Sequence, residues 1–187
     1  MSGTGQSNFQ ITKVNGSYTI DKASSITTVT VANATYDGSP HGGTASVTGA
    51  GGLNESLTVS YSGRNGTVYG PSATAPTNVG DYTASASFGG DANHDGSNDS
   101  KDYSITKALV TATAGSGSAT YDGASKSPSA CVVSGTYTGD LTCANNPASV
   151  GPGAGTTTIY PVVSGTGLTN FQIGVFDDDG NGRQCNL

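Results

Sequence analysis

Two short stretches of the sequence space their oxygen-bearing side chains as a calcium-binding loop does. The first stretch places them at loop positions 1, 3, 5, 9 and 12, namely Asp91, Asn93, Asp95, Asp99 and Asp102. Gly96 stands at position 6, where the loop turns sharply. Asp102 is shorter than the glutamate usual at position 12, which weakens calcium binding or favours magnesium. The alternative interpretation is a polar turn between two strands.

The second acidic stretch lies close to residue 187. It places Asp177, Asp179 and Asn181 at positions 1, 3 and 5, with Gly182 at position 6. Position 12 would fall beyond the sequence, so this loop would bind weakly or take a ligand from a neighbour. The alternative is a turn or a frayed acidic terminus. Ca²⁺ is therefore the one cofactor that the sequence suggests.

Cysteine is the other residue type with a predicted bond. Cys131 and Cys143 are twelve residues apart, on segments that we expect to be adjacent antiparallel strands. A disulfide between them would staple a hairpin and contribute about 3 kcal/mol of stability. Two unpaired, small hydrophobic side chains are the alternative. A disulfide indicates an oxidising, extracellular setting, and Cys185 is left over.

Catalytic, nucleic-acid and membrane functions find little support in the composition. Histidine occurs only at His41 and His94, and the nucleophile-elbow, phosphate-loop and zinc-pair motifs are absent from the sequence. The chain has seven Lys+Arg against thirteen Asp+Glu, whereas nucleic-acid binding requires clustered positive charge. No run of apolar residues approaches the length of a membrane span. We therefore expect a protein that is not an enzyme.

An internal repeat organises the chain. Residues 18–23, Tyr-Thr-Ile-Asp-Lys-Ala, return as Tyr-Ser-Ile-Thr-Lys-Ala at 103–108, an offset of 85 residues. Tyr-Asp-Gly at 36–38 returns at 121–123 with the same offset, and Ala-Thr precedes both copies. Two separate motifs at one offset indicate repeated structural units rather than coincidence.

A third echo sets the boundaries of these units. Asn-Phe-Gln-Ile at 8–11 matches 170–173, so this motif belongs near the end of a repeat. We therefore divide the chain into an N-terminal hairpin or donor-strand segment (1–22), a first repeat (23–107) and a second repeat with an Asp-rich end (108–187).

The composition favours strands throughout. Gly, Ser and Thr number 29, 24 and 26 of the 187 residues, whereas good helix formers are scarce. Apolar and polar residues alternate in short runs separated by turn signals, at 26–31, 57–61, 82–88, 109–113, 130–133, 140–143 and 158–163. Pro161 marks the last run as an edge strand or a bulge. Asn15-Gly16 predicts a hairpin over residues 9–20. The fold class expected is all-β: two tandem Ig-like β-sandwiches preceded by an N-terminal β-hairpin or strand extension.

The chain resembles the bacterial immunoglobulin-like MBG or YDG repeats. The residues that carry the resemblance are the two Tyr-Asp-Gly triplets, the run at 48–54, Phe88–His94, and the Lys-Ala pairs at 22–23 and 107–108. It extends to about Phe176, and the ending from Asp177 departs from the family. The resemblance implies tandem modules of large secreted or cell-surface bacterial proteins, acting as non-catalytic spacers, stalks or adhesive modules.

The residues leave two further functions open. The first is head-to-tail assembly of identical subunits by strand addition. Its donor residues would be Phe9, Ile11, Val14, Tyr18 and Ile20, and its acceptor residues Phe171, Ile173 and Phe176. In the simpler alternative, residues 1–22 pack on their own chain. The second function is carbohydrate-binding or calcium-dependent adhesion, with Tyr61, Tyr69 and Tyr137 stacking on surface glycans.

Overall fold

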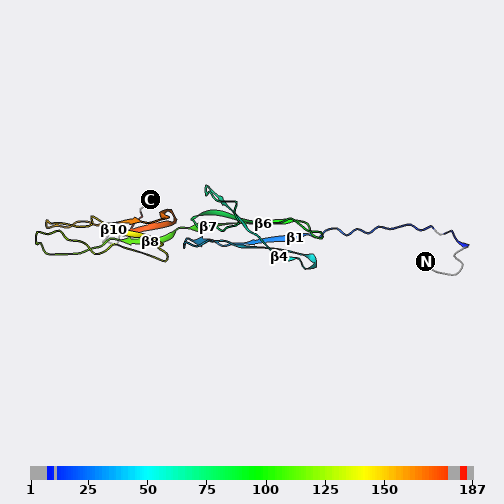
Figure 1. The fold of residues 1–187 in the computed structure, drawn as a ribbon, viewed down its shortest axis with the longest axis horizontal. Coiled ribbons are helices and arrows are strands. Elements are labelled where there is room, and N and C mark those ends of the chain that lie inside the picture. The colour runs from blue at the N-terminus through cyan, green and yellow to red at the C-terminus, as the bar shows by residue number, and fades with distance from the viewer. Residues whose placement is uncertain (1–7, 11, 177–181, 185–187) are drawn as a thin grey trace.

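The computed structural model describes residues 8–10, 12–176 and 182–184. Within these residues the chain is all-β, as predicted: strands alternate with loops and with short 3-10 turns such as Ala50–Gly52 and Leu168–Asn170. None of the described segments forms a helix long and apolar enough to span a membrane. Figure 1 shows two β-rich bodies arranged end to end and an extended N-terminal segment that points away from both.

The first body, here called the N-terminal unit, spans residues 23–107 and contains two sheets. Its strands are β1 (Ser25–Thr30), β2 (Ala34–Thr35), β3 (Thr44–Gly49), β4 (Asn54–Leu57), β5 (Ser60–Arg64), β6 (Gly80–Phe88) and β7 (Ser97–Thr106). One sheet has the order β1-β3-β4 and the other β2-β7-β6-β5. β7 pairs antiparallel with β6 and parallel with β2.

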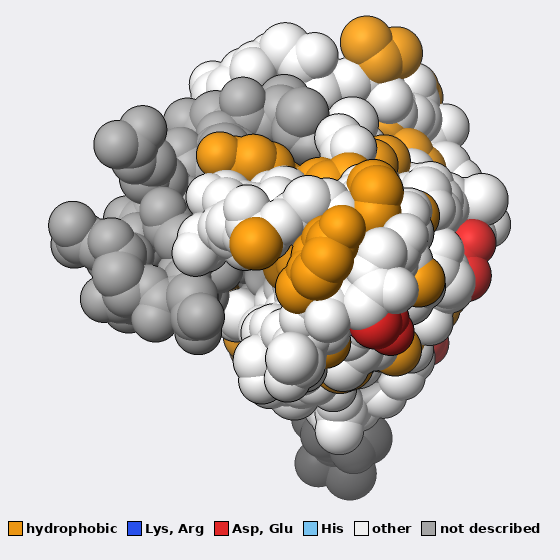
Figure 2. Space-filling model, turned by 90° about the vertical axis from the view of Figure 1, so that its left-hand side faces the viewer, with side chains coloured by type: hydrophobic (Ala, Val, Ile, Leu, Met, Phe, Trp, Pro, Cys, Tyr) orange, Lys and Arg blue, Asp and Glu red, His pale blue; other side chains and the backbone are white. Residues whose placement is uncertain are grey.

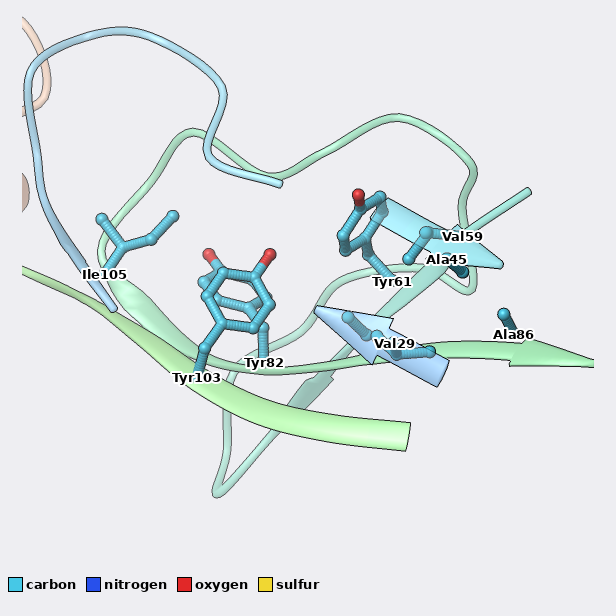
Figure 3. Packing of buried hydrophobic residues seen from close by; sticks show 9 residues of the cluster. Val29, Ala45, Val59, Tyr61, Tyr82, Ala86, Tyr103 and Ile105 are labelled. Carbon is cyan, nitrogen blue, oxygen red and sulfur yellow. The ribbon is translucent and has the colours of Figure 1, made fainter. Parts of the chain in front are cut away.

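Tyrosines dominate the core of the N-terminal unit. β6 buries alternate residues, among them Tyr82 and Ala84, as its alternating sequence predicts. On β7, Tyr103 and Ile105 are 2% and 1% exposed. Figure 3 shows the rings of Tyr82 and Tyr103 beside each other, with Ile105 close by. Large rings thus fill a core that the small residues of the strands would leave thin.

The second body, the C-terminal unit, is described over residues 108–176 and 182–184. Its strands are β8 (Ala108–Thr113), β9 (Val132–Gly135), β10 (Thr142–Asn146), β11 (Tyr160–Ser164), β12 (Phe171–Phe176) and β13 (Gly182–Gln184). One sheet has the order β13-β12-β8-β9, and β10 and β11 form a two-stranded sheet. β12 pairs parallel with β8. Pro161 lies on β11, which pairs only with β10 among the described strands, so the predicted edge position is confirmed.

Two expected elements are not formed. Residues 12–22 contain no strand, so the predicted Asn15-Gly16 hairpin is absent. An isolated two-stranded hairpin is only marginally stable in water, and this segment has no sheet to pack its apolar side chains against. The single strand expected at 57–61 is instead two strands, because the chain crosses from one sheet to the other at Thr58 and Val59.

Candidate functional site: the joint between the two units

The two units meet through three aromatic side chains. Tyr36, which follows β2, packs edge-on against Tyr137 and Phe171 of the C-terminal unit, with ring centroids 5.6 and 5.3 Å apart. Tyr137 and Phe171 stack with their centroids 6.1 Å apart. Tyr36 packs against the hydrophobic cores of both units. The Tyr36 ring therefore makes one continuous apolar contact across the boundary.

Because Gly38 has no side chain, the Tyr137 ring can pack directly against the Tyr-Asp-Gly turn. The backbone φ of Gly38 is +79°, which a glycine adopts without the steric cost that a Cβ imposes. A Cβ at Gly38 would lie 2.1 Å from the hydroxyl oxygen of Tyr137. The turn therefore favours glycine at position 38, and any Cβ there would also displace the Tyr137 ring.

Asn170 adds polar bonds to the same boundary. Its side chain is 5% exposed, and its Oδ1 accepts a hydrogen bond from the Val79 backbone N at 2.9 Å. Its Nδ2 donates to Asn78 Oδ1 at 3.0 Å. Because a buried amide loses stability when its partners are removed, these bonds fix the relative position of the units. We call these seven residues the joint: Tyr36, Gly38, Asn78, Val79, Tyr137, Asn170 and Phe171.

The Tyr-Asp-Gly turn is built in the same way in both units. Asp37 Oδ1 accepts a hydrogen bond from the Ser39 N at 2.8 Å, and Asp122 Oδ1 accepts one from the Ala124 N at 3.0 Å. The hydrogen bond from the Ser39 backbone amide is the main cause of the lowered pKa of Asp37. A hydrogen bond from the Lys126 side chain is the main cause that lowers the pKa of Asp122. Both turns are therefore formed with their carboxylates charged.

The first acidic stretch does not form a calcium loop. β7 begins at Ser97, so Asp99 and Asp102 lie on an extended strand that cannot wrap around an ion with Asp91. Asp99 Oδ2 accepts from the Val29 backbone N at 2.8 Å, and Asp102 Oδ1 accepts from the Thr83 hydroxyl at 2.6 Å. No three acidic, histidine or cysteine side chains of the described residues lie close enough to hold a metal.

The Asp91 end of that stretch holds the start of the N-terminal unit in place. We call the hydrogen-bonded pair Asp91 and His94 the clamp. Asp91 Oδ1 accepts from the backbone N of Asn93 and of His94, both at 2.7 Å. His94 Nδ1 lies 2.9 Å from Asp91 Oδ2, and its Nε2 lies 2.8 Å from the Ala50 carbonyl oxygen. The Asn93 carbonyl accepts from the Ala23 N, so the loop holds the chain where β1 begins.

The pKa values of this clamp shift in opposite directions. The hydrogen bond from His94 is the first cause that lowers the pKa of Asp91. The bond to the Ala50 carbonyl is the first cause that raises the pKa of His94, and the bond to Asp91 is the second. A doubly protonated imidazole satisfies both partners at once, whereas a neutral one can donate to only one of them.

The second acidic stretch, with Asp177, Asp179 and Asn181, lies outside the described residues. Calcium binding there stays a prediction, as does the absence of catalysis.

The predicted disulfide between Cys131 and Cys143 is present, with the two Cα atoms 5.6 Å apart. Its surroundings differ from the prediction. Cys131 precedes β9 and Cys143 lies in β10, and these strands belong to different sheets. The bond therefore ties one sheet of the C-terminal unit to the other, instead of stapling a hairpin. The twelve-residue spacing alone could not distinguish these two geometries.

The donor and acceptor residues predicted for strand addition lie far apart within the chain. On the donor side, Phe9, Val14, Tyr18 and Ile20 are largely exposed, and Ile11 lies outside the described residues. On the acceptor side, Phe171 and Ile173 are buried in the core of the C-terminal unit, so they offer no open surface. Phe176 belongs to β12, but its side chain lies outside the description.

The three tyrosines predicted to bind sugars differ in their exposure. Tyr61 is 4% exposed in the N-terminal core, and Tyr69 packs against that core, with its hydroxyl donating to the Thr74 carbonyl. Tyr137 is part of the joint. The prediction was therefore wrong for Tyr61, whereas Tyr69 and Tyr137 are half-buried and glycan binding by them stays a prediction.

The chain matches no protein-family model, and no curated protein or solved structure is significantly similar to it.

The joint was not predicted from the sequence, although one signal pointed to it. Tyr-Asp-Gly occurs twice, at the same place in each repeat, and the first copy supplies Tyr36 and Gly38. The partners Tyr137 and Asn170 stand in no repeated motif that names them as contacts, so the motif alone could be interpreted only as a turn.

Proposed function

We propose that the chain is a non-catalytic structural module, a stiff spacer of a bacterial surface or extracellular protein. In this proposal each unit is an Ig-like β-sandwich of the MBG/YDG type, and the two stand in tandem. The joint is the observation that supports it. Two domains connected only by a flexible linker would move freely, whereas here aromatic packing and buried amide bonds cross the boundary.

Two more observations support a spacer role outside the cell. The disulfide between the two sheets of the C-terminal unit fits an oxidising compartment. The units lie end to end in Figure 1, which gives the chain a long reach for its number of residues. A stiff series of small modules holds a distal part of a protein at a set distance from its anchor.

Residual dipolar couplings of the chain, weakly aligned in solution, test the stiffness. If the joint holds, one alignment tensor fits both units. Asn170→Ala removes the acceptor of the Val79 amide, and the two units should then require separate tensors. Asn145→Ala is the matched control, because the Asn145 side chain bonds to Gly115 and Ser129 inside the C-terminal unit. Separate tensors in the wild-type chain would contradict the proposal.

A further inference from the structure

The first and last segments of the N-terminal unit run parallel to each other from Ala23 to the joint. Hydrogen bonds connect residues 23–36 to residues 93–106, and the two residues of these bonded pairs are 70 to 72 positions apart. The bonds begin at Ala23, whose N donates to the Asn93 carbonyl, and end at Tyr36, whose N donates to the Thr106 carbonyl. A constant offset means that the segments stay in register, and we call them the parallel pair.

Side chains maintain the parallel pair where its two strands belong to different sheets. β1 lies in the β1-β3-β4 sheet and β7 in the other, so no backbone ladder joins these two strands. The Thr27 hydroxyl contacts the Ser97 carbonyl oxygen at 3.2 Å and the Ser97 hydroxyl at 2.8 Å. The Val29 N donates to Asp99 Oδ2 at 2.8 Å, so a carboxylate takes the place of a backbone acceptor. Thr27 and Val29 are buried, so water competes little for these bonds.

After β1, the first segment crosses to the sheet that contains β7. Asn33 Oδ1 accepts a hydrogen bond from the Ser104 N at 2.8 Å at this crossing. β2 then pairs directly with the end of β7, in the parallel direction. The parallel pair is therefore continuous, although its first segment changes sheets.

The C-terminal unit repeats the parallel arrangement with backbone pairing. β8, its first strand, runs parallel to β12 over five residue pairs. Only Lys107 separates the end of β7 from the start of β8, so the two parallel arrangements follow one another directly along the chain.

The direction of the parallel pair determines how it responds to a pull. The chain enters the first segment at Ala23 and leaves the last segment at Thr106, and these residues lie at opposite ends of the pair. A pull on these two points slides the segments along each other, so the bonds between them resist together. Antiparallel segments would have both points at the same end, and their bonds would open one at a time.

The strands also lie along the direction of such a pull. Figure 1 shows the labelled strands running along the long axis of the molecule. Figure 2 looks along the same axis onto the end that the C-terminal unit forms, so a pull on the two ends of the molecule acts perpendicular to that view.

We propose that the N-terminal unit bears tension along the chain and that the parallel pair is the element that resists it. The inference rests on the proposed spacer function, because only a module held at both ends is pulled in this way. Resistance to a pull is set by the rate of unfolding. The unit should therefore unfold slowly when its opposite ends are pulled and faster when the pull acts at one end of the pair.

Constant-force measurements on single molecules of the full chain test the proposal by changing the direction of the pull. Handles are attached through an azide-bearing residue at two exposed positions, either 20 and 107 or 20 and 92. The first arrangement pulls on opposite ends of the parallel pair, and the second pulls on the same end. At equal force we expect unfolding to be about 30-fold slower in the first arrangement, equivalent to about 2 kcal/mol or two hydrogen bonds that must break together. Equal rates, or a faster rate in the first arrangement, would overturn the proposal.

Two matched variants locate the resistance within the parallel pair. Thr27→Val removes a buried hydroxyl of the pair at nearly constant volume. With handles at positions 20 and 107, this variant should unfold about fivefold faster, equivalent to about 1 kcal/mol for one hydrogen bond. Thr67→Val is the control, because the Thr67 hydroxyl accepts a bond from the Asp81 N at 3.1 Å outside the pair. Its rate should stay close to that of the wild type, and equal rates of the two variants would contradict the role of the pair.

Unfolding in urea separates resistance to a pull from ordinary stability. Thr27→Val and Thr67→Val each delete hydrogen bonds within the N-terminal unit, so both should lower its free energy of unfolding. Asn33→Ala replaces Thr27→Val if that variant does not fold, because Asn33 is exposed and its amide oxygen also belongs to the pair.

Failure of this inference is distinguishable from failure of the spacer proposal. Equal rates in the two pulling arrangements, in a chain that one alignment tensor describes, would overturn tension bearing and leave the stiff spacer standing. Separate tensors, together with slow unfolding only in the first arrangement, would overturn the stiff spacer and leave the resistance of the N-terminal unit standing.

Discussion

The hydroxyl of Tyr137 lies 2.1 Å from the point where a Cβ on Gly38 would stand. The turn glycine of the N-terminal unit, Gly38, is therefore also the surface on which the Tyr137 ring of the C-terminal unit packs. Glycines with positive φ are usually explained by the backbone alone. Here the missing side chain also leaves room for a neighbouring unit, which links the Tyr-Asp-Gly motif to the way in which the units are connected.

Gly38→Ala should therefore cost more than its conformational strain. Left-handed backbone costs an alanine roughly 1 kcal/mol, and the Tyr137 ring must also shift. Gly123→Ala is a close control, because Gly123 has φ +78° and nothing within 4 Å of its Cβ position. We expect both variants to lower thermal stability, and only Gly38→Ala to give the two units separate alignment tensors. Equal dipolar couplings in the two variants would contradict the role of Gly38 in the joint.

Local patterns predicted most of the strands because the alternation of apolar and polar residues marks a segment that a sheet buries on one face. Alternation of small and large residues identified β6, and the Ile- and Val-rich starts of the repeats identified β1 and β8. The same kind of local signal failed at Asn15-Gly16, where the turn sequence is favourable but no sheet supports it. A hairpin requires the packing partner as well as the turn.

The candidate sites were harder to predict because they depend on distant contacts. The spacing of the acidic residues alone fitted a calcium loop. However, Tyr103 and Ile105 belong to the buried core, and Asp99 and Asp102 lie on the same strand, so they are held in an extended backbone instead of a loop. The joint brings Tyr36 together with Phe171, 135 positions away in the numbering. A single sequence contains no signal that pairs these two residues.

The Asp91–His94 clamp should make the stability of the N-terminal unit depend on pH. The pKa of His94 is raised above 6.5 in the folded state, so its contribution is complete below pH 6.5 and is lost as the pH rises through the folded value. The pKa of Asp91 is lowered below 3.8, so its contribution is complete above that pH and is lost as the pH falls through the folded value. The pair therefore stabilises most between these limits.

The measurement is the melting temperature of the wild-type chain and of His94→Gln between about pH 5 and pH 9. The advantage of the wild type should be largest at the acidic end and shrink toward the alkaline end. Titration of the His94 imidazole by NMR gives an independent readout, expected above 6.5. A constant difference between the two melting curves, or an imidazole that titrates below 6.5, would show that the clamp is not linked to protonation.

Calcium should leave the N-terminal unit unaffected. The carboxylates of Asp91, Asp99 and Asp102 already accept hydrogen bonds from three different parts of the unit. A ligand that binds the native state raises the melting temperature, so millimolar Ca²⁺ and its removal by a chelator should give the same transition for this unit. Amide chemical shifts around residues 91–102 should also stay unchanged. A calcium-dependent shift of these amides would restore the loop hypothesis.

Removal of the disulfide should destabilise the C-terminal unit alone. The bond ties the segment before β9 to β10, across the two sheets, and the loop that it closes spans twelve residues. Replacement of Cys131 and Cys143 by serine should reduce the free energy of unfolding of this unit by about 3 kcal/mol, chiefly because the unfolded chain gains freedom. Hydrogen exchange followed by NMR distinguishes the units: protection should fall in β8 and β12 and persist in β6 and β7. A loss of protection in β6 and β7 of the same size would mean that the two units unfold as one.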